Sequence, residues 1–152
     1  MKEKHKLAYM KICEVLANLS ECLRKNRKFG AVLVDPKSNT ILATGYNGYI
    51  RGGTTHCGGE GICIREKMKI KSGERLEIGC IHAEENVLIN ASRQGLSTVG
   101  AWLFLNGEPC ALCARRMVQS GIEKVFVKKC DYPITGTDIL TKNGVKIEFL
   151  DE

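Results

Sequence analysis

Residues 82–128, HAEENVLINASRQGLSTVGAWLFLNGEPCALCARRMVQSGIEKVFVK, decide the fold, because helix and strand patterns alternate along them. Residues 82–95 and 109–121 predict helices, each closed by a glycine. Residues 101–106 and 124–128 are short apolar runs that predict buried strands. This alternation is typical of an α/β domain in which crossover helices pack on a parallel sheet.

The flanking sequence extends this pattern. Residues 30–35 (GAVLVD) and 40–46 (TILATGY) predict a hairpin around the turn DPKSN. Residues 135–144 predict a short helix and residues 145–150 a last strand. Residues 2–25 predict a long helix, whose apolar side chains recur at three- and four-residue steps: Leu7, Ile12, Val15, Leu16, Leu19 and Leu23.

These elements predict a single three-layer α/β domain over residues 1–152, with crossover helices packed on a mostly parallel sheet. A length of 152 residues suits one domain with one core. The chain has no apolar run near 18 residues and is charged from its second residue, so we expect neither a membrane span nor a secretory signal. We therefore expect a cytoplasmic protein.

The formal net charge is +6, and one basic cluster stands out directly before the apolar run FGAVLV. The favoured interpretation from charge alone is a solvated helix end, where cations suit the helix dipole. The alternative is a phosphate contact through this cluster, which consists of Arg24, Lys25, Arg27 and Lys28. Because the chain has no aromatic-basic repeat, we expect no stable nucleic-acid partner.

Two short motifs, HAE at 82–84 and PCALC at 109–113, stand at the starts of two predicted helices. The imidazole of His82 and the thiolates of Cys110 and Cys113 form a good zinc set that leaves a fourth position for water. The C-x-x-C spacing puts both sulfurs on one helical turn, where the helix N-terminus favours the thiolate form. C-x-x-C alone would also fit a redox pair or half of a structural zinc site.

Glu84 makes the catalytic interpretation the stronger one. It lies two residues after His82, where a carboxylate can move protons without binding the metal. A structural zinc site would need a fourth protein ligand and would leave Glu84 unexplained. The order H-x-E followed by P-C-x-x-C is also the established signature of zinc deaminases.

A second group of ligand types begins in the glycine-rich stretch THCGGEGICI, residues 55–64. His56, Cys57, Cys63 and Cys80 suit a closed structural zinc that ties down a long loop. Adjacent His56 and Cys57 are awkward in one tetrahedron, so His5 or a glutamate is an alternative ligand. Reduced packed thiols or a labile disulfide are the other interpretations.

The remaining cysteines of the eight stand apart from both groups. Without an export signal, such a cysteine count favours metal binding and catalysis over a disulfide framework. We predict that Cys13, Cys22 and Cys130 are buried small hydrophobic residues.

The sequence resembles the zinc-dependent cytidine deaminase superfamily, and within it the deoxycytidylate (dCMP) deaminases. The resemblance covers residues 22–150 and rests on the segments FGAVLV, TGYNG, HC…C, SGERLE, C-I-HAEEN, EPCALCARRM and SGIEKVFV. It implies a three-layer α/β/α fold with a five-stranded mixed sheet. It also implies hydrolytic deamination of dCMP to dUMP and ammonia, which supplies thymidylate synthesis.

The resemblance implies residue roles as well. His82, Cys110 and Cys113 would hold zinc, and Glu84 would shuttle protons. The substrate would be contacted by residues from three separate segments: Asn47, Ala83 and Tyr132.

Further implied roles concern phosphate groups, effectors and assembly. The resemblance implies homohexamers and a nucleotide site that dCTP activates and dTTP inhibits, with Mg²⁺ accompanying the nucleotide. The candidates for phosphate or effector contacts are Arg27, Lys28, Gly45, Tyr46, Gly48 and Arg115.

Three alternative functions stay open. The stretch GYNGYIRGGTTHC is one residue longer than the family pattern, so dCTP or a modified dCMP is an alternative substrate. EPCALC also resembles the tRNA adenosine deaminases, which lack the GYNG segment and the cysteine-rich insert. A zinc-stabilised binding module without activity is the last alternative, and the intact Glu84 speaks against it.

Overall fold

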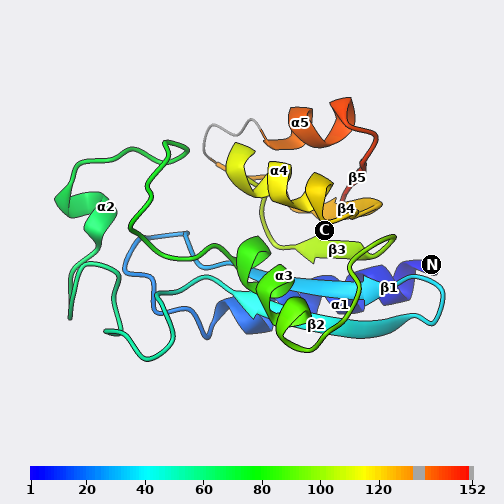
Figure 1. The fold of residues 1–152 in the computed structure, drawn as a ribbon, viewed down its shortest axis with the longest axis horizontal. Helices are drawn as coiled ribbons and strands as arrows, with labels where there is room; N and C mark the ends of the chain where they lie inside the picture. The colour runs from blue at the N-terminus through cyan, green and yellow to red at the C-terminus, as the bar shows by residue number, and fades with distance from the viewer. Residues whose placement is uncertain (132–135, 151–152) are drawn as a thin grey trace.

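The computed structural model describes residues 1–131 and 136–150 as one α/β unit (Figure 1). The predicted hairpin and the later helix–strand alternation are confirmed, with ends shifted by a few residues. The elements, in chain order, are α1 (Glu3–Ala17), β1 (Gly30–Asp35), β2 (Thr40–Tyr46), α2 (Ile64–Lys67), α3 (Ala83–Arg93), β3 (Trp102–Leu105), α4 (Ala111–Gln119), β4 (Lys124–Val127), α5 (Gly136–Lys142) and β5 (Lys146–Phe149).

The five strands form one mixed sheet in the order β2-β1-β3-β4-β5. Strands β3, β4 and β5 pair in parallel, as crossover helices require. Strand β1 runs antiparallel to both β2 and β3. The prediction of a mostly parallel sheet was therefore wrong for β1, whereas the five-stranded mixed sheet is confirmed.

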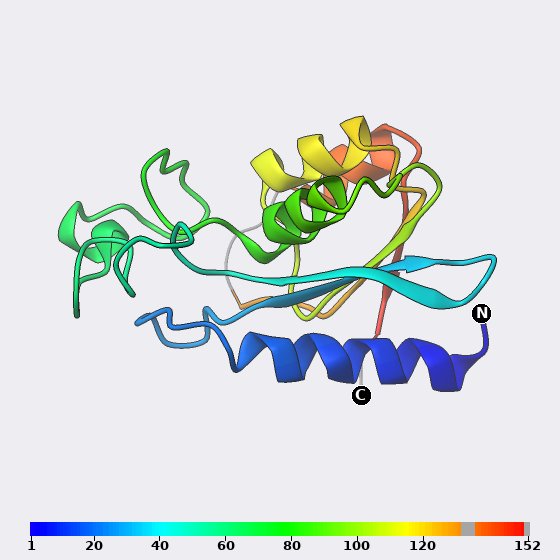
Figure 2. The same cartoon turned by 60° about the horizontal axis from the view of Figure 1, so that its bottom comes forward.

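Helices cover both faces of the sheet, so the three-layer prediction is confirmed (Figure 2). Side chains alternate across β1: Leu33 packs among the residues of α3 and α4, whereas Val32 and Val34 pack under α1. On the α1 face, Phe104 and Phe126 stack with ring centroids 4.3 Å apart. Strands β1, β3 and β4 are thus buried on both faces, which explains their continuous apolar runs.

Helix α1 is shorter than predicted, and only Ile12 and Leu16 of its predicted apolar residues pack against the core. It ends at Ala17, so the predicted leucines beyond it, Leu19 and Leu23, lie in an irregular segment and are exposed. Leu7 and Val15, on the helix itself, are also exposed. The buried face is formed by residues that the leucine pattern had overlooked: Tyr9, Met10, Cys13 and Ala17.

A long connection between β2 and α3 extends beyond one end of the sheet and carries only the short α2 (Figures 1 and 2). Its two ends are joined by reciprocal backbone hydrogen bonds between Gly48 and Ile81. This pairing places the residue before His82 beside the end of β2. None of the helices in residues 1–131 and 136–150 is long and apolar enough to cross a bilayer.

Candidate metal centre and active site

The candidate metal ligands lie where two helices begin. His82 is the N-cap of α3, and Cys110 is the N-cap of α4. Cys113 lies in the first turn of α4, and its backbone N–H donates to Cys110 Sγ at 3.5 Å. Both helices pack on the same sheet face, so their starts bring the three side chains together, as the sequence predicted.

The distances among these side chains fit a tetrahedral zinc ion. His82 Nδ1 lies 3.5 Å from Cys110 Sγ and 3.3 Å from Cys113 Sγ. Ordinary zinc–nitrogen and zinc–sulfur bonds at a tetrahedral angle separate the two ligand atoms by about 3.5 Å. Among the described residues, no other histidine, cysteine or acidic group of three brings its ligand atoms within 4.8 Å of one another.

The charges of the ligands are coupled. A hydrogen bond from Cys113 lowers the pKa of Cys110 to about 4, although burial opposes this. Burial lowers the pKa of His82, but hydrogen bonding to Cys110 and the charge of Glu84 raise it to about 9. The hydrogen bond to Cys110, together with burial, raises the pKa of Cys113. A divalent cation would replace the protons that these groups now share.

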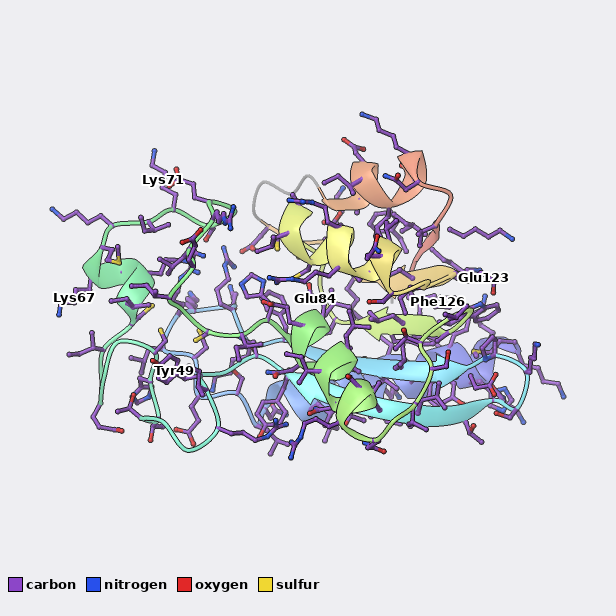
Figure 3. All side chains as sticks on the ribbon, viewed as in Figure 1. Tyr49, Lys67, Lys71, Glu84, Glu123 and Phe126 are labelled. Atoms are coloured by element: carbon purple, nitrogen blue, oxygen red, sulfur yellow. The ribbon has the colours of Figure 1, made fainter. Side chains whose placement is uncertain are left out.

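Glu84 lies between the starts of α3 and α4 and is only 6% exposed (Figure 3). Burial raises the pKa of its carboxyl to about 7, and the nearby His82 opposes the shift. A carboxyl with a pKa near neutrality can both accept and donate a proton at physiological pH. This is the property that a proton shuttle needs.

The family assignment follows from residues 3–129. They match the family model described as the cytidine and deoxycytidylate deaminase zinc-binding region. The chain belongs to this deaminase family. It is 37% identical over 118 residues to a deoxycytidylate deaminase of Schizosaccharomyces pombe, a match that covers 77% of this chain and 34% of the relative. The chain thus spans about a third of that relative's length.

Two phage proteins resemble this chain over most of their length. The deoxycytidylate deaminase of Mycobacterium phage D29 is 32% identical over 123 residues, which cover 80% of this chain and 91% of the relative. The dCMP deaminase of cyanophage S-TIM5, solved in complex with dCMP and dUMP, is 31% identical. Its TM-score is 0.80, with 99% of each chain covered.

The residues of the second predicted ligand group, all within the described part of the chain, line one hollow, but no three of their ligand atoms lie within 4.8 Å of one another. The predicted residues His56, Cys57, Cys63 and Cys80 line one small hollow, and so does Cys22. The prediction that Cys22 is an isolated buried residue was therefore wrong. Cys57 hydrogen-bonds to Cys80, and burial raises the pKa of Cys80 to about 12, with the charge of Cys57 adding to the shift.

His56 is the weakest member of this second group. Its Nδ1 atom accepts a hydrogen bond from Gly61 N at 2.8 Å and lies 3.9 Å from Glu60 Oε2. The alternative ligand His5 lies in the first turn of α1 and does not line the hollow. Cys22 lies far from this loop in sequence, and only the awkward pair of adjacent ligands hinted that another residue was needed.

A cluster of arginines lies between the segment after α1 and the loop after α2. Arg24 Nη2 donates to Ser72 Oγ, and Arg27 Nη2 lies 3.5 Å from the same oxygen. Arg65 Nη1 donates to the carbonyls of Lys71 and Glu74, at 2.7 and 2.8 Å, and so holds the turn that carries Ser72. Arg24 and Arg27 belong to the basic cluster identified from the sequence, whereas Arg65 was not predicted.

Arg65 of the arginine cluster is near enough to the thiols of Cys63 and Cys110 to interact with both electrostatically. Arg65 interacts electrostatically with Cys110 and Arg24, and burial, followed by the charge of Arg24, lowers its pKa. Arg27 also forms an ion pair with Asp131 at 3.0 Å. Lys28, the other predicted phosphate residue, is exposed.

Asn47 connects the end of β2 to this cluster. It is 7% exposed; its Oδ1 accepts from Phe29 N at 2.8 Å, and its Nδ2 donates to Arg27 O at 2.7 Å. A deoxyribose contact by Asn47 stays a prediction.

The other predicted site residues have different positions. Ala83 is fully buried in the first turn of α3, and Gly45 packs against the backbone of that helix. Tyr46 is 40% exposed and Arg115 is exposed on α4, so neither is enclosed in this chain. Tyr132 lies outside the described residues.

Proposed function

We propose that this chain deaminates dCMP hydrolytically, converting dCMP and water to dUMP and ammonia. The observation that carries the proposal is the convergence of His82, Cys110 and Cys113 around a tetrahedral site beside the buried carboxyl of Glu84. The dCMP deaminase relatives and the S-TIM5 structure with dCMP and dUMP support the choice of substrate.

The three ligands would hold zinc, whose Lewis acidity activates water for attack on carbon 4 of the cytosine ring. Glu84 takes a proton from the attacking water and delivers it to the ring nitrogen. It then takes the remaining proton from the hydroxyl group now on carbon 4 and gives it to the amine, which leaves as ammonia. Its burial keeps bulk water from competing for these protons. Asn47, Ala83 and Tyr132 are the proposed contacts for the rest of the nucleoside.

The 5′-phosphate would bind at the arginine cluster. Arg24 and Arg27 direct their guanidinium groups at one hydroxyl, Ser72 Oγ. A phosphate group accepts paired hydrogen bonds from guanidinium groups, so it can replace or join that hydroxyl. This arrangement favours a nucleotide over a nucleoside as the substrate.

The test is a substrate panel: zinc-loaded protein with dCMP, dCTP, deoxycytidine or a tRNA anticodon stem-loop, with ammonia release as the measurement. Turnover of dCMP well above the other three substrates is the expected result. Turnover of the RNA alone would refute the proposal. The absence of any turnover by the zinc-loaded protein would favour the binding-module alternative instead.

We also propose a second, structural zinc in the hollow beside the end of β2. Support comes from the four thiols that line it: Cys22, Cys57, Cys63 and Cys80. A Cys₄ set is a standard structural zinc site, and it frees His56 from ligation. Metal binding would supply the free energy that orders the long connection before His82.

Metal analysis tests the second zinc directly. The purified protein should contain two zinc ions per chain, whereas Cys22→Ser and Cys63→Ser should each contain one. Cys13→Ala is the matched control, because Cys13 is fully buried between α1 and the sheet and should not change the zinc content. One zinc per chain in the wild type, unchanged in both variants, would exclude the second site.

Regulation and assembly remain part of the proposal. We propose a homo-oligomer, with a hexamer as the first candidate, and a response to dCTP and dTTP, with Mg²⁺ accompanying the effector, through the segment Gly45–Gly48 and Arg115. The exposed apolar side chains Val15, Leu19 and Leu23 support contacts with another chain. Mass measurement in solution and dCMP assays with each effector would test both parts. A cytoplasmic location stays a prediction.

A further inference from the structure

Glu85, the residue after the proposed proton shuttle, joins the two helices that carry the metal ligands. It is the third residue of α3, and its Oε1 atom accepts a hydrogen bond from His82 N at 3.1 Å. Its other carboxylate oxygen, Oε2, accepts from Arg116 Nη1 on α4. The Glu85 carboxylate thus accepts hydrogen bonds from the backbone of His82 and from α4, the helix that begins at Cys110 and contains Cys113.

The geometry of the metal centre depends on how α3 and α4 are placed. His82 begins α3, whereas Cys110 and Cys113 belong to the first turn of α4. Arg116 lies three residues after Cys113, about one helical turn further along. The Glu85–Arg116 pair therefore crosses between the helices close to the three ligand atoms.

We propose that Glu85 and Arg116 are positioning residues for the metal centre. Glu85 fixes the backbone of His82, so that Nδ1 faces the two sulfurs. Arg116 holds that carboxylate and sets the distance between the two helix starts. The inference rests on the proposed zinc site and is independent of which substrate is deaminated.

The Glu85–Arg116 pair can position the metal ligands without contributing much to the stability of the fold. The Arg116 side chain is 45% exposed, and exposed ion pairs contribute little to the free energy of unfolding. Partners that orient metal ligands, by contrast, typically change metal affinity by about 10- to 100-fold. Zinc affinity and thermal stability should thus respond differently to the loss of this pair.

Four variants separate the two contacts of Glu85. Glu85→Ala removes both, whereas Glu85→Gln keeps an oxygen for His82 N but removes the charge that Arg116 binds. Arg116→Gln removes the ion pair alone. Arg93→Gln is the matched control, because Arg93 is exposed on α3 and forms no ion pair among the described residues.

Zinc affinity is measured by competition with a chelator, and ligand geometry by the visible absorption of the cobalt-substituted proteins. Glu85→Ala should lower zinc affinity by about 10- to 100-fold and alter the cobalt spectrum. Glu85→Gln and Arg116→Gln should each have smaller, similar effects. The double variant Glu85→Gln/Arg116→Gln should bind zinc no less tightly than the single variant with the lower zinc affinity. Both substitutions remove the same ion pair.

Wild-type zinc affinity and an unchanged cobalt spectrum in Glu85→Ala would overturn the inference. If Glu85→Ala does not fold, the Glu85→Gln and Arg116→Gln pair decides the question. The inference would then be overturned if the two substitutions lowered zinc affinity additively in the double variant. It would also be overturned if each single variant lost no more zinc affinity than Arg93→Gln. None of these measurements needs dCMP turnover, so a failure of the proposed substrate leaves this test intact.

Discussion

At the scale of single residues, the chemistry depends on the positions where helices begin. Because an N-cap side chain points back toward the start of its helix, His82 and Cys110 meet although they are 28 residues apart. The convergence of these side chains was predictable from the sequence, since each motif is local and each marks a helix start. The burial of Glu84 completes the site and gives the carboxyl its raised pKa.

The arginine cluster yields a prediction about substrate choice. Arg24→Gln and Arg27→Gln should each raise KM for dCMP by about 10-fold or more, because a charge-assisted hydrogen bond to phosphate is lost. Deoxycytidine, which has no phosphate, should be converted as slowly by the variants as by the wild type.

Steady-state kinetics on both substrates check this prediction. Arg75→Gln is the control, because Arg75 is exposed and pairs only with Glu77 among the described ion pairs. If the preference for dCMP over deoxycytidine is the same in Arg24→Gln, Arg27→Gln and the control, phosphate binds elsewhere.

Other site residues could not be predicted from the sequence, for a physical reason. Cys22 lines a hollow with cysteines of a distant loop, and Ser72 and Arg65 meet the basic cluster only in the folded chain. No spacing rule connects such residues, whereas helix geometry directly links Cys110 to Cys113.

At the scale of elements, strand β2 and helix α3, the helix that begins at the candidate metal centre, are held in close contact. Gly45 has no side chain, so the strand approaches the helix backbone closely: an added Cβ would lie 2.5 Å from Val87 N and 2.9 Å from Ala83 O. Asn86 and Asn90 reinforce this contact by donating to the β2 carbonyls of Tyr46 and Thr44, each at 2.7 Å.

Gly45→Ala should therefore lower the free energy of unfolding by about 1–3 kcal/mol, because backbone must move to admit the methyl group. Gly48→Ala is the matched control, since a Cβ there would have no neighbour within 4 Å. Urea denaturation of both variants measures the difference. Equal stability of the two would show that β2 and α3 are not in close contact.

The last strand is held by an ion-pair network. Glu148 on β5 accepts hydrogen bonds from Lys6 on α1 and Lys124 on β4, each at 2.6 Å. Partial burial raises the pKa of Glu148, but the hydrogen bonds from Lys124 and Lys6 outweigh it and hold the pKa below its usual value.

A carboxyl with a lowered pKa stabilises the fold above its unfolded pKa, and this contribution is lost as the pH falls through the folded pKa. Glu148→Gln should accordingly lower the free energy of unfolding by about 0.5–1 kcal/mol at neutral pH, a modest value because the network is partly exposed. Thermal melts at neutral and acidic pH check this. A deficit that persists below the folded pKa would contradict the role of the charge.

Element types were predictable along most of the chain, but α1 shows the limit. Its apolar residues lie on more than one face, so the leucine pattern did not identify the buried side. Packing against β1 decided the buried face, and that information lies outside the helix sequence.

At the scale of the whole molecule, the sequence predicted the layers but not every strand direction. A helix between two strands implies parallel pairing, which held for β3, β4 and β5. No such rule predicts the strand direction across the long connection between β2 and α3. In the structure, β1 pairs antiparallel with β3.

Metal removal should affect the entire molecule. A ligand that binds only the folded state stabilises it, so removing zinc with a chelator should lower Tm by several degrees. Adding zinc back should restore Tm, whereas magnesium should not, because the Cys110 and Cys113 thiolates prefer a softer ion. An unchanged melting curve after verified zinc loss would contradict metal-assisted folding.

The most direct test of the central claim is the initial rate of dUMP formation from dCMP by zinc-loaded wild type and Glu84→Gln, with zinc content measured in both. The wild type should turn over dCMP, and Glu84→Gln should lose about 10²- to 10⁴-fold of that rate with its zinc content unchanged. Absence of dUMP with the wild type, or a Glu84→Gln rate close to that of the wild type, would contradict the central claim.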